Sequence, residues 1–398
     1  MRRKGFVPFL IIGFAIVGVT VLSAFTYFKV TYGYWPFLEE KQKVAQPLPI
    51  NKAESGPKFL YYESEVIRPT TNIITDIGEY KNRFIIFDVS TGTKKVIYEE
   101  SWIQDMRDAY RLFQNKILIT AWDGNRAIDL NGQKVTNLPK YYFSGDFSPS
   151  GKIHIGCERE TNIFTFSISD NRKNLKKEIK WIDEQKDWLF PHILGWSSDE
   201  NYAFFVAKDM DSTSKSLYVL DLVKEKVEEF PRDNSILDTQ ATFVDNVRDK
   251  IYFVAKNGFF VQPRNSLKAT PIKLKSFDLS TISDEGIKII SIVFPTDYDN
   301  HSIAISNGKR LIVKDLVSGE ENLVFEDLDG LVRPMSWKGD NLIYFCDGKD
   351  YVLTRPSGGY FYIVGNIYNS KTKKSIEFVN QKSDYYGKVG TAGFIGWL

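Results

Sequence analysis

The sequence predicts an all-β protein built from repeated small sheets and preceded by one transmembrane helix. Three observations favour this class. Aromatic residues make up 15% of the chain, and together with Ile and Val they dominate its apolar residues; such side chains suit pleated, half-buried strands. A pattern of apolar runs and Asp-containing turns recurs along most of the chain. Finally, an uncharged stretch of membrane-spanning length lies near the N-terminus.

Residues 5–28 carry no charged side chain. At about 1.5 Å per residue, a helix of this length reaches ~36 Å and exceeds the roughly 30 Å hydrocarbon core. A cleavable signal peptide is the competing interpretation, and cleavage after Ser23 remains open. Its apolar region is usually about 7 to 15 residues long and ends at an A-x-A-like site, whereas here Leu22 stands two positions before Ala24. We therefore expect residues 5–28 to be retained as an anchor in the lipid bilayer.

Charges around this span predict its orientation. Arg2, Arg3 and Lys4 precede it, and only Lys29 follows closely; an excess of cations marks the cytoplasmic end. Residues 1–4 are then a cytoplasmic tail, and the rest of a single-pass cell-membrane protein lies outside. Residues 29–57 contain several prolines among polar residues, which is typical of an extended linker.

Residues 58–398 contain a repeated unit. Its clearest copy, residues 195–230, reads GWSSDENYAFFVAKDMDSTSKSLYVLDLVKEKVEEF. Ser-Gly and Thr-Gly pairs in the partial copies supply the positive φ of tight hairpins. Seven units of about 49 residues fit a β-propeller of four-stranded blades. Six blades remain an alternative if the weakly marked unit at residues 99–139 is not a full blade.

The two ends of the repeat region complement each other. The first unit starts at Lys58 with what is elsewhere the second strand of a blade, and residues 393–398 (GFIGWL) resemble the innermost-strand sequence ILGW at residues 193–196. A propeller avoids an exposed edge when one terminus completes the blade that the other begins. We expect the C-terminal strand to complete the first blade.

Two copies of the repeat carry a family resemblance. FSPSGK at residues 147–152 and WSSDEN at residues 196–201 each precede an apolar strand. They resemble the W-S-P-D-G-K element of TolB-type six-bladed propellers and of the propeller domains of prolyl-oligopeptidase-family peptidases. The resemblance covers most of residues 58–398. It implies a propeller fold and a role in envelope organisation or assembly.

Motifs for enzymatic chemistry are missing from the sequence. It lacks the G-x-S-x-G nucleophile elbow that the hydrolase domain of those peptidases needs, and it lacks H-E-x-x-H and nucleotide-binding glycine loops. We expect His154 to be a core histidine. The acidic stretch at residues 208–215 lacks the Gly and Glu of a calcium loop. We assign no catalytic residue, metal or cofactor, and the sequence favours a non-enzymatic role.

The charge of the chain argues against nucleic-acid binding, and its two cysteines are expected to be buried and free. The formal net charge is +2, and three positive charges belong to residues 2–4, so the remainder carries no basic footprint for nucleic acid. Cys157 and Cys346 are the only cysteines. Both lie in apolar runs, where a free cysteine acts as a small buried hydrophobe.

The leading hypothesis is a membrane-anchored, extracytoplasmic platform that binds another envelope protein or an envelope polymer. The alternative is a hydrolase or lyase that degrades extracellular glycan or peptide in the propeller tunnel. His192 and Arg333 each lie four residues before a tryptophan of an innermost strand, Trp196 or Trp337. With Trp188, they are the candidate binding residues at one tunnel mouth.

Overall fold

The computed structural model describes thirteen segments, all of them in the second of two compact units, residues 1–48 and 49–398. The described residues are 56–68, 79–103, 109–120, 125–135, 145–160, 163–171, 175–182, 191–207, 216–276, 290–326, 331–347, 361–383 and 391–398. None of their helices is long and apolar enough to cross a membrane. The anchor predicted at residues 5–28 and most of the predicted linker lie outside these segments.

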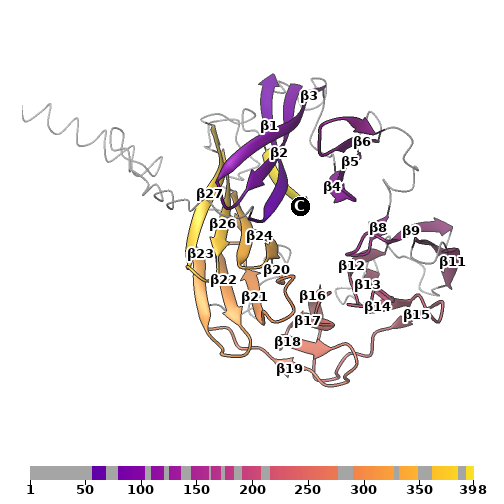
Figure 1. Ribbon diagram of the computed structural model, residues 1–398. Coiled ribbons are helices and arrows are strands. Elements are labelled where there is room, and N and C mark those ends of the chain that lie inside the picture. The colour runs from indigo at the N-terminus through magenta and orange to yellow at the C-terminus, as the bar shows by residue number, and fades with distance from the viewer. Residues whose placement is uncertain are drawn as a thin grey trace, which may run out of the picture. The chain divides into compact units, whose positions relative to one another are not determined.

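The described residues form seven antiparallel sheets of four strands, which follow one another around a ring (Figure 1). The protein is therefore a seven-bladed propeller, as the repeat favoured. Blade one contains β28 (Thr391–Trp397), β1 (Lys58–Arg68), β2 (Glu79–Asp88) and β3 (Thr93–Ile103). Blade two contains β4 (Ala109–Phe113), β5 (Lys116–Thr120), β6 (Arg126–Asp129) and β7 (Lys134–Val135). It is built from the weakly marked unit, so the six-bladed alternative is wrong.

The other five blades are continuous in sequence. Blade three contains β8 (Asp146–Phe147), β9 (Ile153–Glu160), β10 (Ile163–Asp170) and β11 (Leu175–Ile182); blade four contains β12 (His192–Trp196), β13 (Tyr202–Ala207), β14 (Ser216–Asp221) and β15 (Lys226–Glu229). Blade five contains β16 (Thr239–Asp245), β17 (Lys250–Ala255), β18 (Gly258–Pro263) and β19 (Thr270–Pro271). Blade six contains β20 (Ser291–Val293), β21 (Ser302–Ser306), β22 (Arg310–Asp315) and β23 (Glu321–Glu326); blade seven contains β24 (Leu331–Lys338), β25 (Asn341–Asp347), β26 (Phe361–Asn369) and β27 (Lys374–Ser383).

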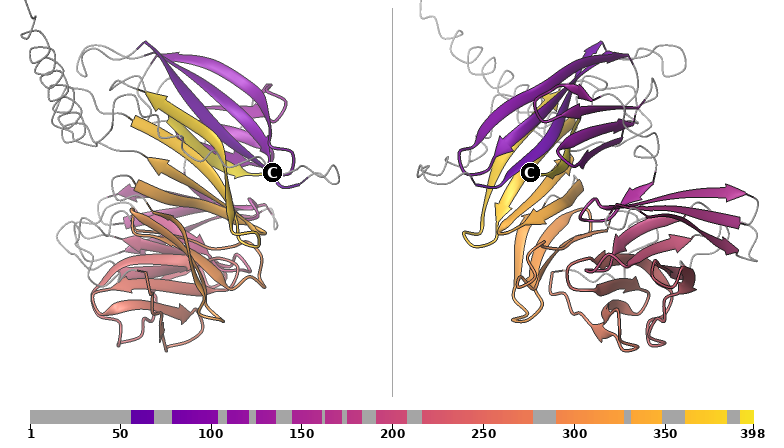
Figure 2. Two further views of the ribbon diagram at one scale, coloured as in Figure 1. Left: turned by 90° about the vertical axis from the view of Figure 1, so that its left-hand side faces the viewer. Right: turned by 45° about the vertical axis from the view of Figure 1, so that its right-hand side comes forward.

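The C-terminal strand closes the ring. β28 pairs antiparallel with β1, with Phe59 opposite Trp397 and Ser64 opposite Thr391. Strand β28 also contacts β4, as β12 contacts β16 and β20 contacts β24. These first strands are therefore neighbours around the centre, and β28 serves as the innermost strand of blade one, as its sequence predicted. Blades one and seven contain the longest strands (Figure 2).

Three innermost strands share a β-bulge just before a tryptophan, and β16 has a bulge of its own at Gln240. The extra residue is Leu194 in β12, Met335 in β24 and Ile395 in β28, each two positions before a tryptophan. The residue after the bulge is small because the next blade lies close to it. A Cβ on Gly195 would come within 2.7 Å of the Val244 Cβ of blade five. The ILGW and GFIGWL similarity thus reflects one local geometry.

The aspartate that ends many third strands caps the turn to the fourth. Asp88, Asp221 and Asp315 each accept hydrogen bonds from the backbone N–H groups two and three residues ahead, which are Asx-type turns. Gly92 and Gly319 follow in the same turns with φ of 68° and 72°. The tight hairpin turns that the Thr-Gly and Ser-Gly pairs predicted are therefore confirmed.

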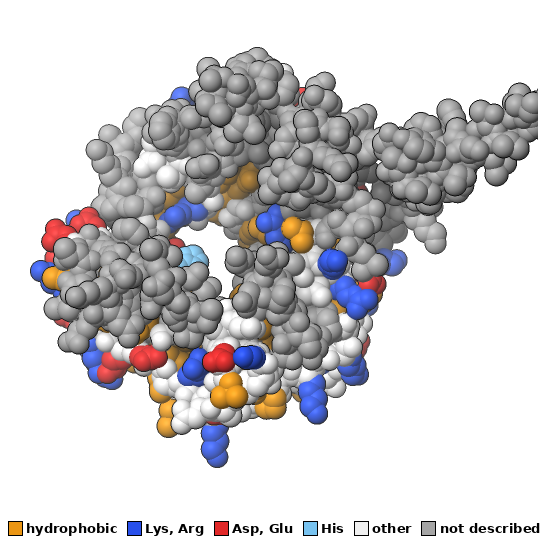
Figure 3. Space-filling view, turned by 180° about the vertical axis from the view of Figure 1, so that it is seen from behind, with side chains coloured by type: hydrophobic (Ala, Val, Ile, Leu, Met, Phe, Trp, Pro, Cys, Tyr) orange, Lys and Arg blue, Asp and Glu red, His pale blue; other side chains and the backbone are white. Residues whose placement is uncertain are grey.

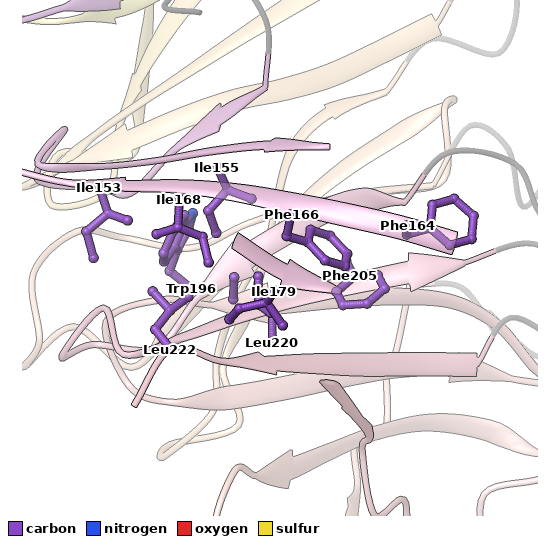
Figure 4. Packing of buried hydrophobic residues seen from close by; sticks show 11 residues of the cluster. Ile153, Ile155, Phe164, Phe166, Ile168, Ile179, Trp196, Phe205, Leu220 and Leu222 are labelled. Carbon is purple, nitrogen blue, oxygen red and sulfur yellow. The ribbon is translucent and has the colours of Figure 1, made fainter. Parts of the chain in front are cut away.

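Apolar clusters fill the spaces between neighbouring blades. Figure 4 shows the cluster between blades three and four, in which Phe166 and Ile168 of β10 lie near Trp196, Phe205 and Leu220 of blade four. Burial of such side chains stabilises the fold by about 1.5 to 3 kcal/mol each. Adjacent blades are held together mainly by these clusters.

Polar contacts join the turns of adjacent blades on one side of the ring. Glu200 of blade four accepts hydrogen bonds from the Ser150 N–H and hydroxyl of blade three (2.6 and 2.7 Å). Asp249 of blade five likewise accepts from Ser198 of blade four. Because antiparallel strands alternate in direction, this side carries the turns between first and second and between third and fourth strands. We call it the turn face, and the opposite side the connection face.

Candidate functional site

Three ionisable side chains lie on the innermost strands of consecutive blades, and two of them are within electrostatic range of the third. Arg111 lies on β4, Asp146 on β8 and His192 on β12. The positive charges of Arg111 and His192 both act on the Asp146 carboxyl. The ring therefore brings together residues that are separated by 35 to 81 positions in the sequence.

Arg111 is held in place by blade three. Its Nη1 donates a hydrogen bond to the Gly145 carbonyl oxygen (2.7 Å), and its guanidinium lies 5.6 Å from the centre of the Phe147 ring. Gly145 adopts a φ of 86°, and a Cβ there would lie 2.1 Å from the Ile155 carbonyl oxygen. Only glycine fits this approach, so the backbone that positions Arg111 depends on Gly145.

Asp146 carries the open carboxyl of this group. Burial raises the pKa of the Asp146 carboxyl above its usual range, and the charges of Arg111, His192 and His154 only partly offset that effect. Within the described segments, no hydrogen bond or ion pair reaches the carboxyl oxygens. Asp146 is therefore half-buried, costly to ionise and available to a ligand.

The two histidines differ in exposure. His154 is buried, as the sequence predicted, and its ring lies 4.8 Å from that of Phe147. His192 is exposed at the start of β12. His192 thus adds an accessible imidazole to the cluster, whereas His154 supports Phe147 from the core side.

The combination of groups suits hydrogen bonding to a ligand. A fixed guanidinium supplies donors, an open carboxyl can accept or, when protonated, donate, and an imidazole can do either. Figure 3 shows cationic and histidine side chains beside an opening through the ring. Among the described residues, no group of three His, Cys, Asp or Glu side chains could hold a metal ion.

The residues predicted from sequence fall in different places. His192 and Arg333 both lie on innermost strands and are exposed, but they belong to blades four and seven. Trp188 lies outside the described segments. Cys157 and Cys346 are both free; Cys346 is buried as predicted, whereas Cys157 is only half-buried.

Comparison with known proteins supports the fold alone. No family model matches the sequence, and no curated protein matches it. Among solved structures, a prolyl endopeptidase is 13% identical with a TM-score of 0.50, and the match covers 81% of this chain and 50% of that one. TolB from Acinetobacter baumannii is 13% identical with a TM-score of 0.38, and the match covers 84% of this chain and 66% of that one.

The predicted resemblance is confirmed for the fold. A third similar structure is the uncharacterized protein lmo1340 from Listeria monocytogenes, 15% identical with a TM-score of 0.42 over 79% of this chain and 94% of that one. This chain spans about half the length of the prolyl endopeptidase and 66% of TolB. At such identities the activities and partners of those proteins are not transferred.

Sequence reasoning missed Arg111 and Asp146. Asp146 opens the DFSPSGK copy of the repeat, and Arg111 lies in the weakly marked unit. Comparison of repeat copies contained one signal, because Asp146 occupies the position of Gly195 in the clearest copy, two residues before the Ser that begins the turn. An ionisable residue where other copies have a small one marks a departure from the purely structural pattern.

Proposed function

We propose that the protein is a membrane-anchored, extracytoplasmic propeller that binds another envelope protein or an envelope polymer. The observation that supports this proposal best is the convergence of Arg111, Asp146 and His192 from three innermost strands. Half-buried ionisable groups that meet on a rigid scaffold are typical of binding sites. The uncharged span at residues 5–28 and the cations before it support the anchor and its orientation.

The test is capture of partners by the full-length protein. Intact cells that express Arg111→Ala, Asp146→Ala and His192→Ala together are crosslinked, and the adducts are compared with those of the wild type. We expect the triple variant to lose most of its adducts. A control variant carries His301→Ala, Asp238→Ala and Lys256→Ala, which removes the same classes of side chain from exposed positions. If both variants captured the same partners equally well, the binding surface would lie elsewhere on the protein.

A second binding surface involves the other predicted residues. A variant with His192, Arg333 and Trp188 replaced by alanine tests the mouth of the tunnel, and it shares only His192 with the first triple variant. We expect it to lose adducts while its melting temperature stays near that of the wild type. Retention of every adduct would exclude His192, Arg333 and Trp188 alike from binding.

One observation favours an enzyme as the second candidate. A carboxyl whose pKa is raised by burial can hold a proton nearer neutrality, as general acids do. Asp146 has this property and lies within electrostatic reach of His192. A hydrolase or lyase would cleave peptide or glycan, and Asp146→Asn would abolish the cleavage. Unchanged peptidoglycan fragments and peptides after incubation with purified protein would exclude this candidate for those substrates.

A further inference from the structure

The most exposed large apolar side chains of the described segments gather on turns. Val317 is 76% exposed, Leu267 69%, Tyr298 65% and Val223 63%. Val223 lies in the turn between β14 and β15, Val317 in the turn between β22 and β23, and Tyr298 in the loop between β20 and β21. These three belong to the turn face of blades four and six, and we call them the apolar tips.

Contacts between blades place these turns on a common face. Arg248, in the first turn of blade five, donates from Nε to the Tyr298 carbonyl oxygen (3.2 Å) and also contacts the Asp297 and Asn300 carbonyls. Lys177 of blade three donates to the Leu222 carbonyl, next to Val223. Lys373 of blade seven pairs with Glu320, next to the turn that carries Val317. The tips are therefore mounted on turns that neighbouring blades hold in place.

The chain enters the propeller on the same face. The Gly56 N–H donates to the Ser90 hydroxyl (3.2 Å), and the Val89 N–H donates to the Pro57 carbonyl oxygen (3.1 Å). Residues 89 and 90 belong to the turn between the third and fourth strands of blade one, and β1 runs from there toward the connection face. Residues 56 and 57, the first that the structure describes, thus lie on the turn face.

We propose that the turn face rests on the surface of the lipid bilayer, with Val223, Tyr298 and Val317 inserted between lipid headgroups. This inference rests on the proposed anchor. A bilayer interface accepts separate apolar and tyrosine tips surrounded by polar groups, whereas the buried core of a protein–protein interface is more apolar and packed as densely as a protein interior. Asp297 and Asp299 flank Tyr298, so the contact does not depend on anionic lipid.

The experiment uses the full-length protein reconstituted in phosphatidylcholine vesicles. A Val317→Cys variant carries an environment-sensitive fluorophore on the turn face, and Lys256→Cys carries it on the connection face, in the turn between β17 and β18. Cys346 is buried and burial raises the pKa of the Cys157 thiol to about 11, so the native thiols react slowly at neutral pH. Labelling of the unsubstituted protein measures the remaining background.

We expect nitroxide-labelled phosphatidylcholine to quench the label at position 317 several-fold more than the label at 256. Adding Val223→Asp and Tyr298→Asp should reduce the quenching at 317 to the level seen at 256. The matched control adds Leu237→Asp and Ile67→Asp, which replace exposed apolar residues outside the turn face and should leave the quenching unchanged.

Two failures are distinguishable. Equal, weak quenching at 317 and 256 in protein that resists extraction by alkaline carbonate would overturn the docking while leaving the anchor intact. Extraction of the protein by carbonate would overturn the anchor, and the docking with it. Quenching at 317 that persists after the two aspartate substitutions would show that the tips are not the contact.

Discussion

Glu200 shows how one residue can combine a turn with a contact between blades. It occupies the position of glycine in the W-S-P-D-G-K pattern and has a φ of 56°, a conformation that is uncommon for residues other than glycine. Its carboxylate accepts two hydrogen bonds from Ser150 of the neighbouring blade. Glutamate at this position therefore strains the backbone, but it adds a polar contact between two blades that glycine could not make.

Replacing Glu200 by alanine should lower the stability of the propeller. The strained φ persists while two hydrogen bonds to a carboxylate are lost, and such bonds contribute about 1.5 to 3 kcal/mol. Glu225→Ala is the matched control, because Glu225 also has a positive φ (58°) but makes only an ion pair with Lys177, which contributes less than about 1 kcal/mol when exposed. Denaturant midpoints of the purified variants measure both effects, and equal midpoints would contradict this role of Glu200.

Asp146→Asn should raise the stability at pH 7 and leave it unchanged near pH 3. The folded-state pKa of Asp146 is raised, mainly by burial, so its contribution to stability is complete below the unfolded pKa of about 3.9 and is lost as pH rises through the folded pKa. Arg111, His192 and His154 face the same carboxyl.

Asp315→Asn is the control of opposite sign. Hydrogen bonds from the Ser318 and Val317 backbone lower the pKa of Asp315, so the ionised form stabilises the fold above pH 4 or so, and its loss should lower the denaturant midpoint at pH 7. If Asp146→Asn also lowered the midpoint at pH 7, Asp146 would be a structural residue rather than an open carboxyl.

At the scale of elements, β28 contributes most to the closure of the ring. It pairs with β1, and its side chains join two clusters: Phe394 and Trp397 pack with blade seven, while Ile395 packs with blade two. The Trp397 indole also donates to the Ser336 hydroxyl (3.0 Å). One short strand thus links three blades.

Deleting residues 393–398 should make the protein aggregate or unfold at a much lower temperature. The deletion exposes the edge of β1 and removes four large apolar side chains, whose burial contributes up to about 1.5 to 3 kcal/mol each. Thermal unfolding monitored by tryptophan fluorescence and light scattering measures the change. An unchanged melting temperature would mean that the ring closes without β28.

Elements were predictable from the sequence where local signals determine them. Asp-capped turns and Ser-Gly or Thr-Gly pairs depend on neighbouring residues, so they identified hairpins and the seven-fold repeat. The cluster of Arg111, Asp146 and His192 was not predictable in the same way, because it depends on which strands adjoin across the ring.

At the scale of the molecule, a rigid ring presents two faces with different roles. The turn face contains Gly56 and the apolar tips. The innermost strands start at the connection face, where His192 is the first residue of β12. If the turn face docks on the bilayer as proposed, the connection face points away from the bilayer and is accessible to envelope partners.

The orientation of the predicted anchor in the membrane can be tested separately. A cysteine placed at Ser55 in the full-length protein should react with a membrane-impermeant reagent in intact cells, because the cations at residues 2–4 favour a cytoplasmic N-terminus. A cysteine at Lys4 is the control and should react only after the membrane is permeabilised. Protection at position 55 and labelling at position 4 in intact cells would reverse the orientation.

Site-specific photocrosslinking tests whether the innermost strands form the binding site. A photoreactive amino acid is placed at His192, or at Lys256 on the connection face as the control, and cells are irradiated intact. We predict discrete adducts with an envelope protein or polymer from position 192 that disappear when Arg111→Ala and Asp146→Ala are added, and none from position 256. Identical adducts from both positions, or adducts from position 192 that survive those two substitutions, would mean that the innermost strands do not form the binding site.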